Sequence, residues 1–299
     1  MIEAHSGGMK RKPGPDNPVA LFKKPRQDLV PSESHALKAK EGRDLFRQVP
    51  SQGNILASSG FDRQIYLWKV YGECENYGMI TGHTGAILDL HFSGDGSTLY
   101  TGSTDKTVGI KRLKGHSGFV NSVHPARRGP PLLVSGSDDC TIKTWDQRKR
   151  GPTHSFNNTF QVTGVSYNDT ADQIISGGID NTSRYGTFGE HDDFYSFGHT
   201  DTITGCLCLL MVSYALTNSM DNSLRIWDMR QSIQWTQTQF RKNLLRCSWS
   251  PDGAMIAAGS ADRFVYIWIL LQDESSITSR HLGSVNEIDF HKLEPIGMF

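Results

Sequence analysis

The chain of 299 residues is long enough to form one large domain or two small ones. Its 31 basic and 31 acidic residues balance, so no overall charge would draw the protein to nucleic acid or to a membrane surface. No apolar run approaches the roughly 20 residues of a membrane-spanning helix, and the first dozen residues lack the apolar block of a signal peptide, so we expect a soluble intracellular protein.

The first 52 residues are rich in proline and charged side chains and contain few paired apolar positions. Such a composition cannot bury enough apolar surface to form a core, so we expect a disordered tail over residues 1–52. Two short basic clusters stand ten residues apart in this tail: Lys10, Arg11 and Lys12, and then Lys23, Lys24 and Arg26. Their spacing is similar to that of a bipartite nuclear import signal, and a solvated basic tail is the simpler alternative.

From residue 53 to residue 299 one pattern repeats: small residues, a turn that contains an aspartate, and an alternating run that most often ends in tryptophan. Aligned on that turn, the aspartates are Asp62, Asp105, Asp139, Asp180, Asp221 and Asp262. Four of the five spacings are 41 or 43 residues and the other is 34, and a period of about 40–45 residues is typical of four-stranded propeller blades. Gly-His pairs that end at His83, His116 and His199 precede three of the aspartates by 22 or 23 residues.

The repeats differ in completeness. The first begins at its second strand (58–68), and the second (101–116) lacks the Trp-Asp pair and the outer strand. The fourth has Tyr185-Gly186 where the Trp-Asp pair should stand, and the sixth has lost its histidine. The seventh starts at 281–290 and stops before its aspartate. We therefore predict an all-β, seven-bladed propeller whose first, second, fourth and seventh blades are incomplete or degenerate, and we expect reduced stability or an open ring. Six intact blades is the alternative count.

The repeated residues predict a structural staple. An aspartate in a tight turn can accept backbone N–H groups and fix a histidine, which can contact a hydroxyl and, through it, an indole. The predicted sets are His116, Ser137, Asp139 and Trp145 in the third repeat, His199, Ser219, Asp221 and Trp227 in the fifth, and Asp262 with Trp268 in the sixth. A hydrolase also combines serine, histidine and aspartate. Because this trio recurs once per repeat, we interpret it as structural and expect neither an enzyme nor a cofactor.

The Gly-His, aspartate and Trp-Asp landmarks (Trp145-Asp146 and Trp227-Asp228) resemble the WD-repeat β-propeller family. The segments NLLRCSWSPDG (243–253) and IAAGSADRFVYIW (256–268), with the loop PARRGP (125–130), are similar to the WD-repeat subunits of the spliceosomal U5 small nuclear ribonucleoprotein. The resemblance implies a nuclear, non-catalytic scaffold that docks on the large central splicing protein of that particle. It implies RNA contact at most indirectly, and no membrane or small-molecule substrate.

In such a propeller the residue after each aspartate lies on one rim. Arg263, Arg63 and Lys106 would then form a basic arc that meets an acidic partner surface or an RNA backbone. The plain alternative is that this turn position tolerates long polar side chains. Arg127 and Arg128 are further partner-contact candidates, in a loop that proline holds extended.

Two other function classes remain open at this point. A generic WD-repeat adaptor, for example a substrate receptor of a ubiquitin ligase, would share the fold, although such adaptors often carry a helical module that this tail does not offer. An enzyme would need a catalytic constellation that does not repeat, and the sequence has none. Cys206 and Cys208 have too few companions for zinc, so we expect inward-packed thiols and no metal site.

Overall fold

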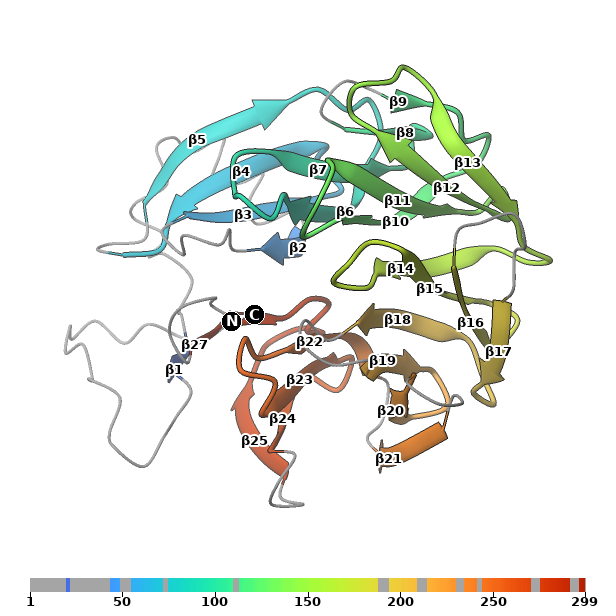
Figure 1. Ribbon diagram of the computed structural model, residues 1–299. Coiled ribbons are helices and arrows are strands. Elements are labelled where there is room, and N and C mark those ends of the chain that lie inside the picture. Colours follow the sequence, from blue (N-terminus) through green and yellow to red (C-terminus); the bar gives the residue numbers. More distant parts are fainter. Residues whose placement is uncertain are drawn as a thin grey trace.

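The computed structural model describes residues 20–21, 44–48, 55–71, 75–109, 113–187, 194–208, 214–229, 234–240, 244–269, 275–290 and 296–298. Within these ranges the chain forms strands and no helix. The strands make six four-stranded antiparallel sheets and one three-stranded sheet, which stand radially around a common centre (Figure 1). The fold is therefore a β-propeller with seven blades, as the sequence predicts.

Each of the six larger blades takes its strands in chain order from the centre outward. Blade one contains β2 (Asp44–Gln48), β3 (Ile55–Gly60), β4 (Gln64–Lys69) and β5 (Asn76–Thr81). Blade two contains β6 (Ile87–Phe92), β7 (Leu99–Ser103), β8 (Thr107–Val108) and β9 (Leu113–Lys114). Blade three contains β10 (Val120–Pro125), β11 (Leu132–Ser137), β12 (Thr141–Asp146) and β13 (Pro152–Asn157).

Blade four contains β14 (Val162–Tyr167), β15 (Gln173–Gly178), β16 (Thr182–Thr187) and β17 (Phe194–Gly198). Blade five contains β18 (Ile203–Cys208), β19 (Tyr214–Ser219), β20 (Ser223–Asp228) and β21 (Gln234–Phe240). Blade six contains β22 (Leu244–Trp249), β23 (Met255–Ser260), β24 (Phe264–Ile269) and β25 (Ser275–Arg280). Blade seven joins β26 (Asp289–Phe290), β27 (Ile296–Met298) and β1 (Ala20–Leu21), and β1 pairs with β27 in parallel.

Packing between neighbouring blades makes the core. Between blades five and six, for example, Leu216, Leu224 and Ile226 pack against an aromatic face that carries Tyr266 and Trp268. The opposite face of blade six packs against Val285, Ile288 and Phe290 at the start of blade seven. A strand buried on one face only would alternate apolar and polar residues, whereas both faces of these middle strands are covered. Met255–Ser260 is accordingly buried at all six positions.

The structure corrects three details of the predicted blade inventory. Blade one has its innermost strand, because Asp44–Gln48 pairs with β3 inside the region predicted as tail. Blade two keeps a third and an outer strand, each only two residues long. Blade four has a full third strand and an outer strand at Phe194–Gly198. A blade strand needs only a few residues that pair with its neighbour, so it can form without a Gly-His or Trp-Asp landmark.

Candidate functional site

The aspartate turns organise one rim of the disc. In blade three, Asp139 Oδ1 accepts the Thr141 N–H at 3.0 Å and the Thr141 hydroxyl at 2.6 Å, while its Oδ2 accepts the Ser117 N–H at 2.8 Å. One carboxylate thus holds both its own turn and the loop that enters the blade. These hydrogen bonds keep the pKa of Asp139 below its usual value, against the effect of burial, which alone would raise it.

A chain of three further hydrogen bonds starts from the same carboxylate. Asp139 Oδ2 lies 2.9 Å from His116 Nδ1, and His116 Nε2 lies 2.7 Å from the Ser135 hydroxyl, which accepts the Trp145 indole N–H at 2.8 Å. The carboxylate can only accept, so Nδ1 carries the proton and Nε2 accepts the Ser135 O–H. Burial lowers the pKa of His116, which is consistent with this neutral ring.

Blade five repeats the chain with a threonine. His199 Nδ1 lies 2.9 Å from Asp221 Oδ2, and its Nε2 lies 2.7 Å from Thr217 Oγ1, which accepts the Trp227 N–H at 2.8 Å. Burial also lowers the pKa of His199. In blade two the first two links are present, because His83 lies 2.9 Å from Asp105 and 2.7 Å from the Thr101 hydroxyl.

The hydroxyl in each chain differs from the predicted one by two positions. Ser135 and Thr217 take the role, whereas Ser137 and Ser219 accept the backbone N–H of the aspartate in their own turns, at 3.2 and 3.1 Å. Residues two apart share a strand face, so alternation cannot choose between them. The position of the indole makes the choice. Trp145 pairs with Leu133, so its N–H reaches the hydroxyl of Ser135 and not that of Ser137.

Blades one, four and six satisfy the aspartate without a histidine. The hydroxyl of Tyr66 donates to Asp62 at 2.8 Å and that of Tyr266 donates to Asp262 at 2.6 Å, each from four residues further along. In blade four Arg184 pairs with Asp180 at 3.0 Å from the same position. A residue that follows the aspartate by four positions thus replaces the imidazole.

The hydrogen bond between the tryptophan and the hydroxyl is present in blade one and missing in blades four and six. Trp68 donates its indole N–H to Ser58 at 2.9 Å. In blade six Ala258 stands in place of that serine, and the buried Trp268 N–H has no hydrogen-bond partner among the described residues. In blade four Gly186 pairs with Ile174 as Trp145 does with Leu133, so Gly186, and not Tyr185, takes the tryptophan position.

The serine–histidine–aspartate geometry does not form a catalytic site. Ser135 and Thr217 are fully buried, and each hydroxyl accepts a hydrogen bond from an indole N–H. A nucleophile has to reach a substrate carbon, and these oxygens lie inside the packed interface between blades.

The residue after each aspartate has a left-handed backbone. The φ values are positive at Arg63, Lys106, Cys140, Asn181, Asn222 and Arg263, between 62° and 76°. This conformation closes each turn, and it is unusual outside glycine. Arg63, Lys106 and Arg263 are exposed, whereas the other three are half-buried, and the basic arc as a partner surface stays a prediction.

Sequence reasoning missed an apolar arc on the same rim. Phe61, Ile179 and Met220 directly precede three of the aspartates, and their exposed fractions are 57%, 44% and 53%. Phe119 and Phe160 are also about half exposed, in the loops that lead into blades three and four. The backbone joins these loops to the turns, because Phe119 C=O accepts the N–H of Asp138 at 2.9 Å. The position before Asp62, Asp180 and Asp221 carried the signal, since it holds a large apolar residue although it lies in a turn.

The two loop arginines differ in their surroundings. Arg128 is exposed and pairs with Asp169 at 3.3 Å, which leaves most of its side chain in solvent. Arg127 is half-buried, and burial lowers its pKa while Asp289 and Asp169 raise it. Of the pair, Arg128 is therefore the one that a partner can reach directly.

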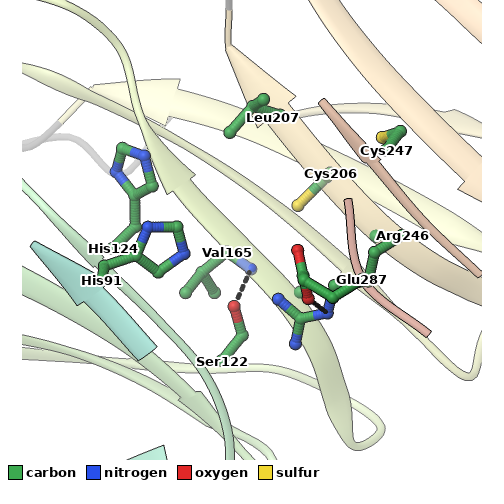
Figure 2. A pocket seen from close by; sticks show the side chains of 11 residues that line it. His91, Ser122, His124, Val165, Cys206, Leu207, Arg246, Cys247 and Glu287 are labelled. Atoms are coloured by element: carbon green, nitrogen blue, oxygen red, sulfur yellow. Dashed lines mark hydrogen bonds and ion pairs between the residues drawn. The ribbon is translucent and has the colours of Figure 1, made fainter. Parts of the chain in front are cut away.

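A small cavity of about 40 Å³ lies among the inner strands. Figure 2 shows His91 and His124 on one side of it, and Arg246 with Glu287 on the other. Arg246 Nη1 donates to Asp89 at 3.0 Å and its Nε lies 3.5 Å from Glu287, so one guanidinium joins inner residues of blades two, six and seven. Burial raises the pKa of Glu287 well above its usual value, and Arg246 only partly opposes this effect.

Several sequence-based expectations concern other sites. No group of three metal-ligating side chains occurs in the described part of the chain. Cys206 and Cys208 are buried strand residues, and burial raises the pKa of the Cys208 thiol to about 12. The described part of the chain contains no helix that is long and apolar enough to cross a membrane. The basic clusters at 10–12 and 23–26 lie outside the described residues.

The radial sheets and their repeated aspartate turns define a WD-repeat β-propeller. The family model for the WD domain, G-beta repeat, matches residues 74–110, 109–146, 192–228 and 235–268. The chain belongs to the family of the U5 small nuclear ribonucleoprotein 40 kDa proteins. It is 45% identical to the mouse (Mus musculus) protein of that name, over 99% of this chain and 89% of the relative, and 47% identical to the human (Homo sapiens) one, over 91% and 82%.

A more distant relative also has a name that refers to splicing. The pre-mRNA-splicing factor cwf17 of Schizosaccharomyces pombe is 35% identical over 84% of this chain and 80% of its own length. The mouse alignment extends over 325 positions although this chain has 299 residues. Some residues of that relative therefore have no counterpart here, in keeping with the shortened second blade.

Proposed function

We propose that the protein is a non-catalytic interaction scaffold of the splicing machinery and a component of the U5 small nuclear ribonucleoprotein. The observation that carries the proposal is the 45–47% identity to the U5 40 kDa proteins over at least 91% of the chain. A similarity of that extent covers the rim and the inner strands together. The absence of catalysis is supported by the burial of the staple hydroxyls, which leaves the repeated trio no access to substrate.

The rim offers the means to hold a protein partner. Arg63, Lys106 and Arg263 supply exposed positive charge on blades one, two and six, and exposed apolar side chains occupy the same rim on blade one and on blades three to five. Apolar side chains with a charged border are the composition of protein-binding surfaces. We infer that this rim docks on the large central protein of the particle, with positive charge facing an acidic surface.

The rim assignment can be tested with charge reversals in an affinity purification from nuclear extract. The double variant Arg63→Glu, Arg263→Glu should lose the U5 proteins and small nuclear RNA that the unchanged chain retains. The control is Arg150→Glu, because Arg150 is exposed in the turn between β12 and β13, at the other end of the strands. Equal capture by both variants at low salt would contradict the rim assignment. Co-purification of ubiquitin-ligase subunits in place of U5 proteins would contradict the scaffold proposal itself.

We also propose that the protein acts in the nucleus. The basic clusters at Lys10–Lys12 and Lys23–Arg26 would direct import, because their spacing fits a bipartite signal. A fluorescent fusion in which Lys23 and Lys24 are changed to alanine should shift to the cytoplasm. A fusion that stays nuclear would assign import to another segment or to a bound partner.

A further inference from the structure

The cavity among the inner strands arises at one position that recurs from blade to blade. This position pairs with the residue three before the aspartate, and it holds Asp89 in blade two, Ser122 in blade three, Gly164 in blade four and Gly205 in blade five. Serine and glycine fill little of the space near the centre of the ring. A cavity of about 40 Å³ therefore remains, and its lining comes from blades two to seven.

Blade six contributes a long side chain beside this cavity. Arg246 Nη1 donates to Asp89 Oδ1 at 3.0 Å, and its Nη2 donates to the Asn121 C=O at 3.3 Å. Both terminal nitrogens of the guanidinium are thus directed toward blades two and three. The Nε of Arg246 lies 3.5 Å from Glu287 Oε2, and this contact is an ion pair without a hydrogen bond.

Glu287 is left with too few hydrogen-bond donors. Its Oε2 is buried and accepts no hydrogen bond from the described part of the chain. Such groups are rare in folded proteins, because an unpaired buried carboxylate costs stability. Burial accordingly raises the pKa of Glu287 well above its usual value. The side chain as a whole is 16% exposed and the cavity is only partly enclosed, so a small ligand can reach this carboxylate.

The described charges around the cavity leave it negative. The two imidazoles that line it are neutral, since burial lowers the pKa of His91 and since His124 Nδ1 accepts the Tyr167 N–H at 3.2 Å. The carboxylates that act on one another or on His91 exceed the guanidinium groups by one: they are Asp89, Glu287 and Asp289, against Arg127 and Arg246. A cation beside Glu287 would balance this charge.

We propose that the cavity binds a primary ammonium group, either of a small free amine or of a lysine side chain from a partner protein, which donates a hydrogen bond to Glu287. An ammonium carries its charge and three donors on one small nitrogen, whereas a guanidinium is a larger planar group. The Ser122 hydroxyl accepts the Val165 N–H at 3.3 Å and has a second lone pair for the same ligand. The site lies among the inner strands, so it does not depend on the rim proposed above.

The test titrates two amines into the full chain at pH 7.5 and constant ionic strength, while NMR follows the backbone amides of Val165, Cys206 and Cys247, which line the cavity. Methylammonium represents a free amine, and the amide of N-acetyl-lysine represents a lysine side chain. We expect saturable shifts with methylammonium and a Kd on the order of 10 mM, because a ligand of so few atoms gains little binding free energy. Saturation by the lysine derivative as well would assign the site to a partner's lysine, and saturation by methylammonium alone would assign it to free amines.

Two glutamates give a matched pair of variants. Glu287→Gln keeps the shape of the side chain and should weaken amine binding by about tenfold or more, since the charge that attracts the ammonium is lost. Glu75→Gln removes one negative charge as well, but Glu75 is exposed on blade one, where it pairs with Lys69. This control should leave binding within about twofold. Tetramethylammonium tests the unchanged protein directly, because it carries the same charge without an N–H and should produce no saturable shift.

Other outcomes would overturn the proposal. Absence of saturable shifts with both amines, or an equal response to tetramethylammonium, would exclude an ammonium site in this cavity. Equal weakening by Glu287→Gln and Glu75→Gln would mean that the amines respond to the overall charge of the protein and not to this carboxylate. Saturable shifts with inorganic phosphate, and none with methylammonium, would assign the cavity to anions held by Arg246.

Discussion

Substitution of Ser135 by alanine tests whether the hydrogen-bonded chain in blade three stabilises the fold. Ser135 Oγ accepts the Trp145 N–H at 2.8 Å and its O–H is directed to His116 Nε2 at 2.7 Å. Ser135→Ala removes one oxygen and leaves two buried groups, an indole donor and an imidazole acceptor, without partners. Water does not replace the hydroxyl, since residue 135 is fully buried.

The expected loss follows from these two groups. A buried polar group left without a partner costs about 1–3 kcal/mol. His116 keeps its hydrogen bond to Asp139 in the variant. The loss of stability therefore comes only from the indole N–H and from His116 Nε2. We therefore expect Ser135→Ala to lower the free energy of unfolding by about 2–4 kcal/mol, with the change in buried volume small.

The reverse substitution in blade six should stabilise the protein. Ala258 stands where blade one has Ser58, and the Trp268 N–H lacks a partner among the described residues. Tyr266 and Asp262 already reproduce the contact of Tyr66 with Asp62. Ala258→Ser therefore recreates the complete arrangement of blade one and should add about 0.5–1.5 kcal/mol.

Guanidinium unfolding of the full chain, followed by tryptophan fluorescence, measures both changes against the unchanged protein. For a fold of this size, 1 kcal/mol corresponds to a shift of about 2–4 °C in the unfolding midpoint, which scanning calorimetry can confirm. An effect of Ser135→Ala below about 0.5 kcal/mol, or a clear destabilisation by Ala258→Ser, would refute the view that these hydroxyls support the indoles.

Three further predictions concern the turns and the centre of the ring. Arg63→Gly should raise stability by about 0.5 kcal/mol in thermal unfolding, because glycine adopts the positive φ of 67° without strain, and yet it should weaken partner capture. Glu287→Gln should raise the melting temperature at pH 7.5 and lose that advantage below pH 4.5, since a raised folded pKa means that ionisation in the fold costs stability as pH rises. Although burial alone would raise it, hydrogen bonds from Ser223 and Thr200 hold the pKa of Asp221 at about 2, so stability should fall as pH drops from about 4 to 2 and Asp221→Asn should flatten that profile.

Much of the fold could be predicted from the sequence because the blade signal is local. The aspartate at the turn and the small residues before it, such as Ser260 and Asp262, recur at a period that only stacked sheets explain. The turn also fixes where the left-handed residue falls, so the exposed positions of Arg63 and Arg263 followed from alignment alone.

Other features depend on neighbours that a single strand does not encode. Ser135 and Ser137 are identical residues on one strand face, and the choice between them rests on the indole of a different strand. The inner strand at Asp44–Gln48 carries no landmark, since pairing with β3 alone defines it. The third strand of blade two is two residues long in the described part of the chain, and spacing indicated this only as a missing segment.

The variation among blades indicates which part of the repeat the fold requires most. All six aspartates are retained, whereas the group that meets them is an imidazole in three blades, a phenol in two and a guanidinium in one. Each solution supplies a side-chain donor to the carboxylate, and in blade five Arg225 adds a second one at 3.4 Å. A partly buried carboxylate with fewer donors would be costly. The tryptophan varies more, because its loss removes packing and a single hydrogen bond. A search for shortened relatives of this family should therefore weight the aspartate turn and its following residue above the Trp-Asp pair.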